Sequence, residues 1–114
     1  MHEYSAVCLE VINGNTIRVD LDLGFDIRQK MTLRLYGIKA LGTRGESGGE
    51  QATAAKDFLK QSIEGQPVII RTYKDKDNKH GQLLADVFNG PSISVNQQML
   101  TAGLATAYFG GKRI

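Results

Sequence analysis

The chain has 114 residues, the size of one domain with a single modest hydrophobic core, and we expect residues 1–114 to form one domain. Its 14 basic and 12 acidic residues give a formal net charge of +2, so charge alone neither requires nor excludes a partner that carries phosphate groups. No apolar stretch approaches the roughly 20 residues that cross a bilayer, so we expect neither a membrane span nor a membrane partner.

The single cysteine and the first residues bear on the compartment. Cys8 lies in an apolar run, where we expect a small buried side chain without chemistry. The opening MHEYSAV lacks the basic and then hydrophobic stretches of a secretory leader. Together these features predict a reduced, cytoplasmic environment.

The first third of the chain alternates apolar and polar residues with a period of two, which predicts strands with one face on a core. The apolar positions of the first two strands are Val7, Leu9 and Val11, followed by Ile17, Val19, Leu21 and Leu23. Between them, Asn13 and Gly14 readily adopt positive φ, which predicts a tight hairpin. A third strand follows LGFD, with Met31, Leu33 and Leu35 on one face and Thr32, Arg34 and Tyr36 on the other.

The apolar period then changes to three and four residues, which predicts an amphipathic helix. Its apolar positions within EQATAAKDFLKQSIEG are Ala52, Ala55, Phe58, Leu59 and Ile63. Gly65 is placed to end this helix. Two further strands are predicted over residues 68–73 and 83–88, separated by the polar segment KDKDNKHGQ.

A second helix is predicted to begin at SVNQ and to stop at Gly103, because Ser94 and Gln97 have the spacing of a capping box. The order strand, strand, strand, helix, strand, strand, helix is typical of an OB-fold. We therefore predict an α+β, mainly β protein: a partly open five-stranded barrel with two main helices. The side chains expected in its core include Leu9, Val11, Ile17, Val19, Leu33, Leu35, Leu59, Val87 and Leu100.

Five separated segments of the chain resemble the staphylococcal nuclease, or thermonuclease-like, family. They are VINGNTIRVDLDLGF, MTLRLYGIKALGTRGE, QATAAKDFLK, HGQLLADVF and SVNQQMLTAGLATAY, and they cover nearly the whole chain in the family's order. The resemblance implies the OB-fold that the periodicity also predicts. For active members it implies hydrolysis of DNA or RNA with a calcium ion.

The resemblance also implies where the site lies, and there the charged residues of the family are replaced. Asn15 stands where the family has a calcium-binding Asp in the first hairpin. Lys39 and Gly42 stand where it has a second calcium-binding Asp and a Glu that acts on the attacking water. Gln82 replaces an Arg that steadies the phosphate, so Arg34 alone remains of the family's charged set.

These replacements disfavour the family's chemistry. Calcium takes six to eight oxygen ligands and relies on carboxylates, whereas Asn15 offers one neutral carbonyl. A charge such as that of Lys39, about 4 Å from another, costs roughly 4 kcal/mol at an effective dielectric constant near 20, and a divalent ion doubles this. We therefore predict no bound calcium, no other cofactor, and a degenerate site without catalytic residues.

A first hypothesis is a catalytically inactive nuclease homologue that acts as a binding module. Its partner would be single-stranded DNA or RNA, or another protein. Phosphate contacts would come from Arg34, Lys39, Lys79 and His80. Arg34 could instead pair with a strand carboxylate such as Asp86.

Two other hypotheses stay open at this stage. One is a divergent metal-dependent phosphodiesterase in which Glu46, Glu50, Asp20 or Asp86 replace the lost ligands, since the glycines of GTRGESGGE could bend the glutamates inward. The other is a structural or assembly subunit, for example one that associates through an open edge of the barrel.

Overall fold

The computed structural model describes residues 2–40, 49–72, 83–90 and 93–107, with residues 2, 39, 40, 49–52 and 83 described by their backbone. The elements in chain order are β1 (His2–Asn13), β2 (Thr16–Gly24), β3 (Ile27–Leu35), β4 (Ile38–Ala40), α1 (Gly49–Ile63), β5 (Pro67–Thr72), β6 (Leu83–Phe88), α2 (Val95–Thr101) and β7 (Ala105–Ala107).

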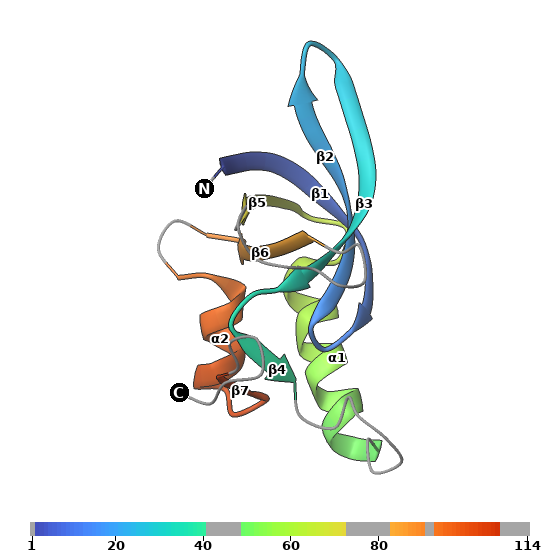
Figure 1. Ribbon diagram of the computed structural model, residues 1–114. Coiled ribbons are helices and arrows are strands. Elements are labelled where there is room, and N and C mark those ends of the chain that lie inside the picture. The colour runs from blue at the N-terminus through green and yellow to red at the C-terminus, as the bar shows by residue number, and fades with distance from the viewer. Residues whose placement is uncertain (1, 41–48, 73–82, 91–92, 108–114) are drawn as a thin grey trace.

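Five strands close into a barrel in the order β1, β2, β3, β6, β5 (Figure 1). All neighbours are antiparallel except β3 and β6, which pair in parallel through Leu33–Leu35 and residues 83–85. The predicted α+β barrel with two helices is confirmed. The barrel is closed where a partly open one was expected. The outer edges of β2 beyond Leu21 and of β3 before Leu33 are not paired with β1 or β6, so the strand edge open to assembly lies on the projecting end of the β2–β3 hairpin.

Two bulges shift the inward face of β1. The pairing with β2 passes from Cys8 to Glu10 and from Val11 to Asn13 while β2 advances by one residue each time. The extra residues, Leu9 and Ile12, are each 40% exposed. The prediction that Leu9 is buried was therefore wrong, because each inserted residue changes which side chains face the core.

The β1–β2 hairpin lies where the sequence predicts it, but its backbone differs from the expected one. Neither Asn13 nor Gly14 has positive φ. Instead, the backbone N–H of Asn15 donates to Oδ1 of Asn13 at 3.0 Å. A side-chain hydrogen bond to the backbone two residues later is an established device for closing turns, so the left-handed conformation is not needed here.

The β2–β3 hairpin extends beyond the barrel. The pairing of β1 with β2 reaches only Leu21, whereas β2 and β3 continue to pair as far as Gly24 and Ile27. We call this projecting part, residues 22–30, the overhang; Figure 1 shows it pointing away from both helices. Leu23 was expected to face the core and is 40% exposed, because no neighbouring strand covers it.

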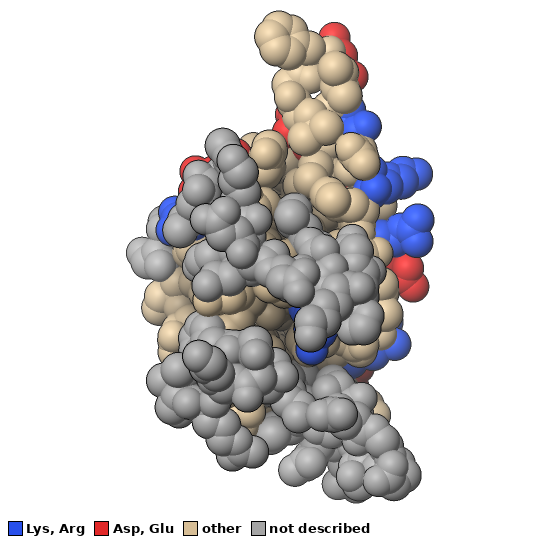
Figure 2. All heavy atoms as spheres, viewed as in Figure 1, with Lys and Arg blue, Asp and Glu red and all other residues tan. Residues whose placement is uncertain are grey.

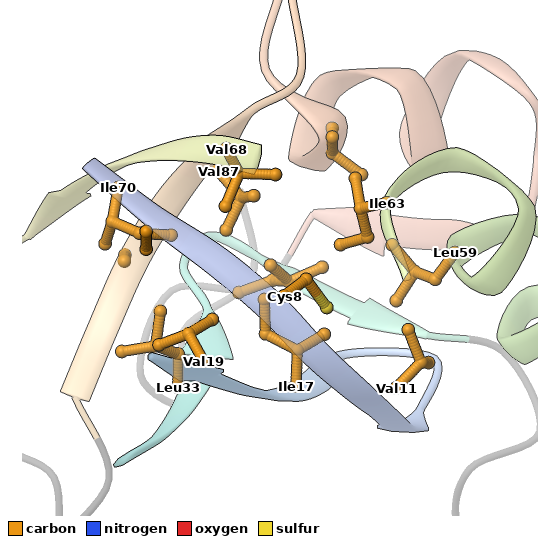
Figure 3. Close-up of a cluster of buried hydrophobic side chains, with 14 of the residues drawn as sticks. Cys8, Val11, Ile17, Val19, Leu33, Leu59, Ile63, Val68, Ile70 and Val87 are labelled. Atoms are coloured by element: carbon orange, nitrogen blue, oxygen red, sulfur yellow. The ribbon is translucent and has the colours of Figure 1, made fainter. Parts of the chain in front are cut away.

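Both predicted helices are confirmed. On α1, Ala55, Leu59 and Ile63 are fully buried, and Figure 3 shows Leu59 and Ile63 among the core side chains. Gly65 follows the helix with φ +78°. On α2, the Ser94 side chain accepts a hydrogen bond from the Gln97 backbone N–H at 3.1 Å, and Gly103 follows with φ +77°. The capping and stop signals in the sequence therefore correspond to real helix ends.

The core is apolar and continuous from the barrel to the helices (Figure 3). Seven of the nine side chains expected in the core are buried, namely Val11, Ile17, Val19, Leu33, Leu35, Leu59 and Val87. Leu100 is half-buried and packs against this core. Cys8 is fully buried, as expected. No helix among the described residues is long and apolar enough to span a membrane.

Two features were not predicted. β4 and β7 form a separate two-stranded sheet, in which residues 38–40, just after β3, pair with residues 105–107, the last ones that the structure describes. Asn96 of α2 is buried. Its amide nitrogen donates hydrogen bonds to the backbone carbonyls of Tyr36 and Ala85 at 2.7 and 3.1 Å, and its amide oxygen accepts one from the backbone N–H of Val87 at 3.0 Å. This one side chain therefore ties α2 to β6 and to the end of β3.

Candidate functional site

The first hairpin and β3 meet at the position that the sequence marks as the site. Thr16 is the register partner of Arg34, and the backbone N–H of Leu35 donates to the Asn15 carbonyl at 2.9 Å. Asn15, in the turn before β2, and Arg34, on β3, are distant in the sequence and are thus held close together. The register of Thr16 against Arg34 and the bond from Leu35 to Asn15 fix this arrangement.

The side chain of Asn15 is 5% exposed and serves the turn. Its Oδ1 accepts a hydrogen bond from the Thr16 hydroxyl at 3.0 Å, while its backbone N–H is bound by Asn13. The amide oxygen of Asn15 is therefore already an acceptor within the protein. This role of Thr16 was not predicted, although its hydroxyl directly follows Asn15.

Arg34 is half-buried on the outer face of the barrel, between Thr16 on β2 and Leu84 on β6. Its guanidinium forms no ion pair with any carboxylate of the described residues. The register instead sets Asp86 opposite Arg71. The alternative in which Arg34 merely balances a strand carboxylate such as Asp86 thus finds no support in the described part of the chain.

Lys39 lies in β4, directly after the chain turns at Gly37, whose φ is +82°. Its backbone pairs with Thr106 of β7. Glu50 is in α1 and is described by its backbone. The other residues proposed for the site, Gly42, Glu46, Lys79, His80 and Gln82, lie outside the described residues.

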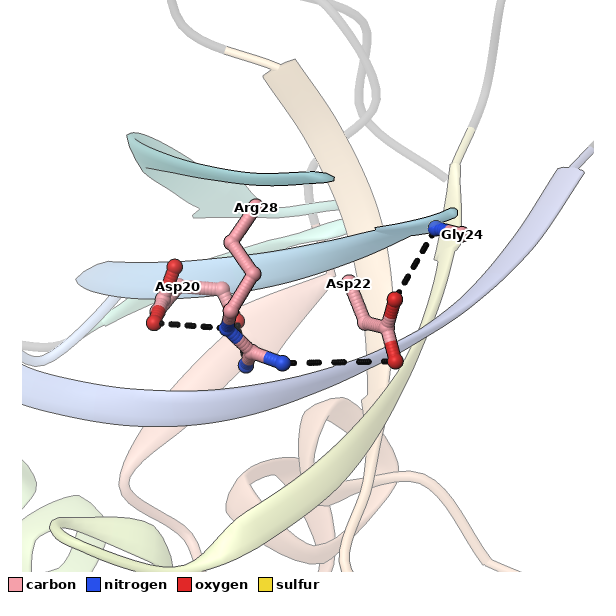
Figure 4. A network of polar contacts seen from close by, with 4 residues as sticks. All are labelled: Asp20, Asp22, Gly24 and Arg28. Atoms are coloured by element: carbon pink, nitrogen blue, oxygen red, sulfur yellow. Dashed lines mark hydrogen bonds and ion pairs between the residues drawn. The ribbon is translucent and has the colours of Figure 1, made fainter. Parts of the chain in front are cut away.

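Asp20 is not positioned as a free ligand. Its carboxylate Oδ2 lies 2.9 Å from Nε of Arg28, and its backbone carbonyl accepts a second bond from the same guanidinium at 3.2 Å (Figure 4). Within the described ranges no group of three or more His, Cys, Asp or Glu side chains is arranged to hold a metal ion. The described part of the chain therefore gives no support to Asp20 as a replacement ligand.

The described residues of this hairpin also do not fit calcium. The side-chain amide oxygens of the turn are the Oδ1 atoms of Asn13 and Asn15, both neutral, and each already accepts a hydrogen bond. No carboxylate of the described residues accompanies them within the turn. A hard divalent cation binds where charged oxygens are available, so this hairpin does not provide the ligand set that the family's ion needs.

Comparison of the amino-acid sequence with those of known proteins identifies related proteins. The family described as staphylococcal nuclease homologue matches residues 32–113. A protein of Escherichia coli O157:H7 named "Uncharacterized endonuclease" is 30% identical over 100 residues, which cover 88% of this chain and 58% of that protein. A protein of Staphylococcus hyicus named "Thermonuclease" is 29% identical over 110 residues, which cover 95% of this chain and 62% of that protein.

The chain thus spans about three fifths of the length of these curated relatives. The family match includes the end of β3 with Arg34, the residues around Lys39, both helices and the strands between them. It begins after β1, β2 and the first hairpin, which the matches to the two relatives must largely include, since these cover 88% and 95% of the chain. The chain therefore belongs to the staphylococcal nuclease homologue family.

Proposed function

We propose that this domain is a nuclease homologue that has lost the family's calcium-dependent catalysis and binds single-stranded nucleic acid at the former site. The observation that carries the proposal is the state of Arg34 on β3 and of Asn15 in the turn that meets it. Arg34 keeps a guanidinium without a carboxylate partner among the described residues, and Asn15 uses its amide oxygen to hold the turn.

The binding half of the proposal follows from the chemistry of Arg34. A guanidinium offers a planar set of donors that matches two oxygens of a phosphate, and it is always charged. A half-buried guanidinium is less fully hydrated than an exposed one, so a phosphate there replaces less water. Lys39, Lys79 and His80 remain the predicted additional phosphate contacts.

The loss of catalysis follows from what hydrolysis of a phosphodiester requires. A metal ion or a carboxylate must activate the attacking water, and cations must stabilise the charge that develops on the phosphate. Asn15, Lys39 and Gly42 replace the residues that would do the first task, and Gln82 replaces one of two that would do the second. Arg34 alone provides binding without an activated nucleophile.

A second candidate is favoured by the names of the two relatives, an endonuclease and a thermonuclease. In this reading the domain is a divergent metal-dependent phosphodiesterase that uses Glu46 or Glu50 as new ligands. This second candidate requires the metal to be bound without Asp20, because the Asp20 carboxylate already forms an ion pair with Arg28.

A cleavage assay separates these candidates. The protein is incubated with labelled single-stranded DNA and RNA in calcium, magnesium or manganese, and calcium binding is followed by calorimetry. We expect no cleavage above a buffer control and no heat of calcium binding. Metal-dependent cleavage that disappears in Glu46→Gln or Glu50→Gln would overturn the proposal in favour of the phosphodiesterase.

A restoration variant tests the same point from the other side. The substitutions Asn15→Asp, Lys39→Asp, Gly42→Glu and Gln82→Arg together rebuild the family's charged set on this barrel. We expect calcium-dependent cleavage from the fourfold variant and none from any single one, because the metal and the water activator act as a unit. Activity in the unchanged chain would contradict this expectation.

Binding is tested by fluorescence anisotropy with labelled oligonucleotides. We expect binding that weakens as salt rises, since the phosphate contacts release counterions. Arg34→Gln should weaken it at low salt. The control Lys60→Gln removes the same charge from α1, where Lys60 lies 3.9 Å from Glu64, and should leave binding unchanged. A chain that binds no oligonucleotide at low salt would overturn the proposal, and a protein partner would become the better hypothesis.

A further inference from the structure

The outer face of the β2–β3 ribbon carries charged residues on both strands at a spacing of two. The register sets Thr16 opposite Arg34, Arg18 opposite Thr32, Asp20 opposite Lys30 and Asp22 opposite Arg28. Cross-strand partners lie on the same face of a sheet, so these side chains form one continuous surface. This surface begins at Arg34, the residue on which the proposed function rests, and leads outward to the overhang.

Three cations on this surface have no ion-pair partner within the described ranges: Arg34, Arg18 and Lys30. Arg18 and Lys30 are exposed, and Arg34 is half-buried. Lys30 faces Asp20 across the two strands, yet the Asp20 carboxylate forms its ion pair with Arg28. In Figure 2 the blue atoms of Lys and Arg gather along the edge of the molecule formed by these strands.

The two carboxylates on the same surface are held by Arg28 (Figure 4). Its Nε lies 2.9 Å from Asp20, and another of its nitrogens lies 4.0 Å from Asp22. Asp22 also accepts a hydrogen bond from the Gly24 backbone N–H at 2.9 Å. The negative charge of β2 is therefore gathered at the outer end around Arg28. Glu10 of β1 is the register partner of Arg18 and adds one exposed carboxylate beside the inner part, where Arg34, Arg18 and Lys30 still leave an excess of positive charge.

The spacing of the cations suits a polyanion in an extended conformation. Alternate residues of a strand are about 6.6 Å apart, so Arg34 and Lys30 are separated by roughly 13 Å with Arg18 alongside the middle of that interval. Successive phosphates of an extended single-stranded nucleic acid recur at an interval similar to the distance between alternate residues of a strand. A folded protein partner offers no comparable row of regularly spaced negative charges.

From these observations we infer that Arg34, Arg18 and Lys30 form a track along which a single-stranded nucleic acid leaves the former site. The inference rests on the proposed function and adds to it the direction of the strand and two residues that the sequence reading did not select. The signal was present in the alternation of β2 and β3, because Arg18, Lys30 and Arg34 fall on the polar positions.

The test compares long and short ligands. Anisotropy is measured with labelled oligothymidylates of 3 and 12 nucleotides at several salt concentrations. The double variant Arg18→Gln/Lys30→Gln leaves Arg34 in place, so short oligonucleotides should bind as they do to the unchanged protein. We expect the 12-mer to bind about tenfold more weakly, with the slope of log affinity against log salt reduced by roughly 1.4, or about 0.7 for each lost contact.

The matched control is Lys56→Gln/Lys60→Gln, which removes two charges from α1 at the opposite end of the molecule from the overhang (Figure 1). It should leave both affinities and the slope unchanged. Circular dichroism and thermal unfolding confirm that both double variants are folded. Equal weakening by the two double variants would mean that only net charge matters and would overturn the track.

The outcomes distinguish the track from the proposed function. If the unchanged protein binds the 12-mer and Arg18→Gln/Lys30→Gln binds it equally well, the track is wrong and the proposed function stands. If the unchanged protein binds neither oligonucleotide, both fail. If the double variant loses the 3-mer as well, Arg18 and Lys30 belong to the former site itself and no outward track exists.

Discussion

The two halves of the β2–β3 ribbon have the same alternating sequence pattern and opposite surroundings. In the half within the barrel, Ile17 and Leu33 face each other and are fully buried. In the overhang, Leu23 lies at a bulge between Asp22 and Gly24, and Ile27 lies two pairs of residues beyond Met31 on the face of Leu33; their side chains are 40% and 55% exposed. Alternation sets which face a side chain occupies, whereas the reach of the neighbouring strand β1 decides whether that face is covered.

The largest expected effect tests this difference directly. Leu33→Ala should lower the free energy of unfolding by about 2–5 kcal/mol, because it leaves a cavity in a close-packed core. Ile27→Ala removes a similar side chain from the same face of the same strand and should cost no more than about 0.5 kcal/mol. Urea unfolding of both variants measures this. Similar losses would mean that the overhang is covered in solution.

The pKa of Cys8 gives a second measure of how well the interior of the barrel is shielded from water. Burial raises the pKa of its thiol from the ordinary 9.0 to about 11, and the charge of Glu64 adds to the rise. The unfolded chain therefore loses this proton at lower pH than the folded one. The thiol's contribution to stability is complete below pH 9 and is lost as pH rises to about 11, by roughly 2–3 kcal/mol.

The measurement is urea unfolding between pH 7 and pH 11. Other groups also titrate in this range, so the unchanged protein is compared with Cys8→Ala at each pH. We expect the stability difference between them to shrink as pH rises. A constant difference would show that the folded barrel admits the thiolate.

Most of the fold could be predicted from the sequence because its signals are local. Alternation identified β2 and β3, the three- and four-residue period identified α1, and Ser94 and Gly103 marked the ends of α2. What could not be predicted depends on partners distant in the chain. The bulge at Leu9 follows from the fit of β1 against β2, and the sheet of β4 and β7 joins segments far apart in sequence.

The candidate site was predictable in part. Its position was an implication of the family resemblance and stays a prediction, while the register sets Thr16, next to Asn15, opposite Arg34. The use of the Asn15 amide by Thr16 was not predictable, since it depends on side-chain geometry. Nor was the pairing of Asp20 with Arg28, which removes one of the ligands suggested for a rewired metal site.

The turns at the two ends of the ribbon suggest a smaller, stabilising change. Asn13 and Gly14 have no positive φ, whereas Phe25 and Asp26 in the overhang have φ of 54° and 62°. A two-residue hairpin turn with both φ values positive favours Asn-Gly, and an aromatic residue there is strained. Phe25→Asn/Asp26→Gly should therefore raise the free energy of unfolding by about 1 kcal/mol.

Phe25→Ala is the control for this change, because it removes the 97% exposed ring and keeps a side chain that disfavours positive φ. The comparison is made by the midpoint of urea unfolding. If Phe25→Ala stabilises the protein as much as the double change, the gain comes from losing the ring and not from the backbone.

The smallest expected effect on stability concerns Arg28, whose side chain is 45% exposed and whose partner Asp20 is 23% exposed. An ion pair this open to water contributes less than about 1 kcal/mol, and salt screens it. Arg28→Ala should therefore lower the unfolding free energy slightly at low salt and not measurably at high salt.

The effect of Arg28→Ala on nucleic-acid binding should be larger than its effect on stability, because the substitution leaves Asp20 and Asp22 unpaired and free to repel a phosphate backbone on the track. The control Lys30→Ala removes one positive charge and leaves no carboxylate unpaired. Arg28→Ala should therefore weaken 12-mer binding at least as much as Lys30→Ala does, although Arg28 lies farther from the former site. Binding that is unchanged in Arg28→Ala would show that these carboxylates do not face the nucleic acid.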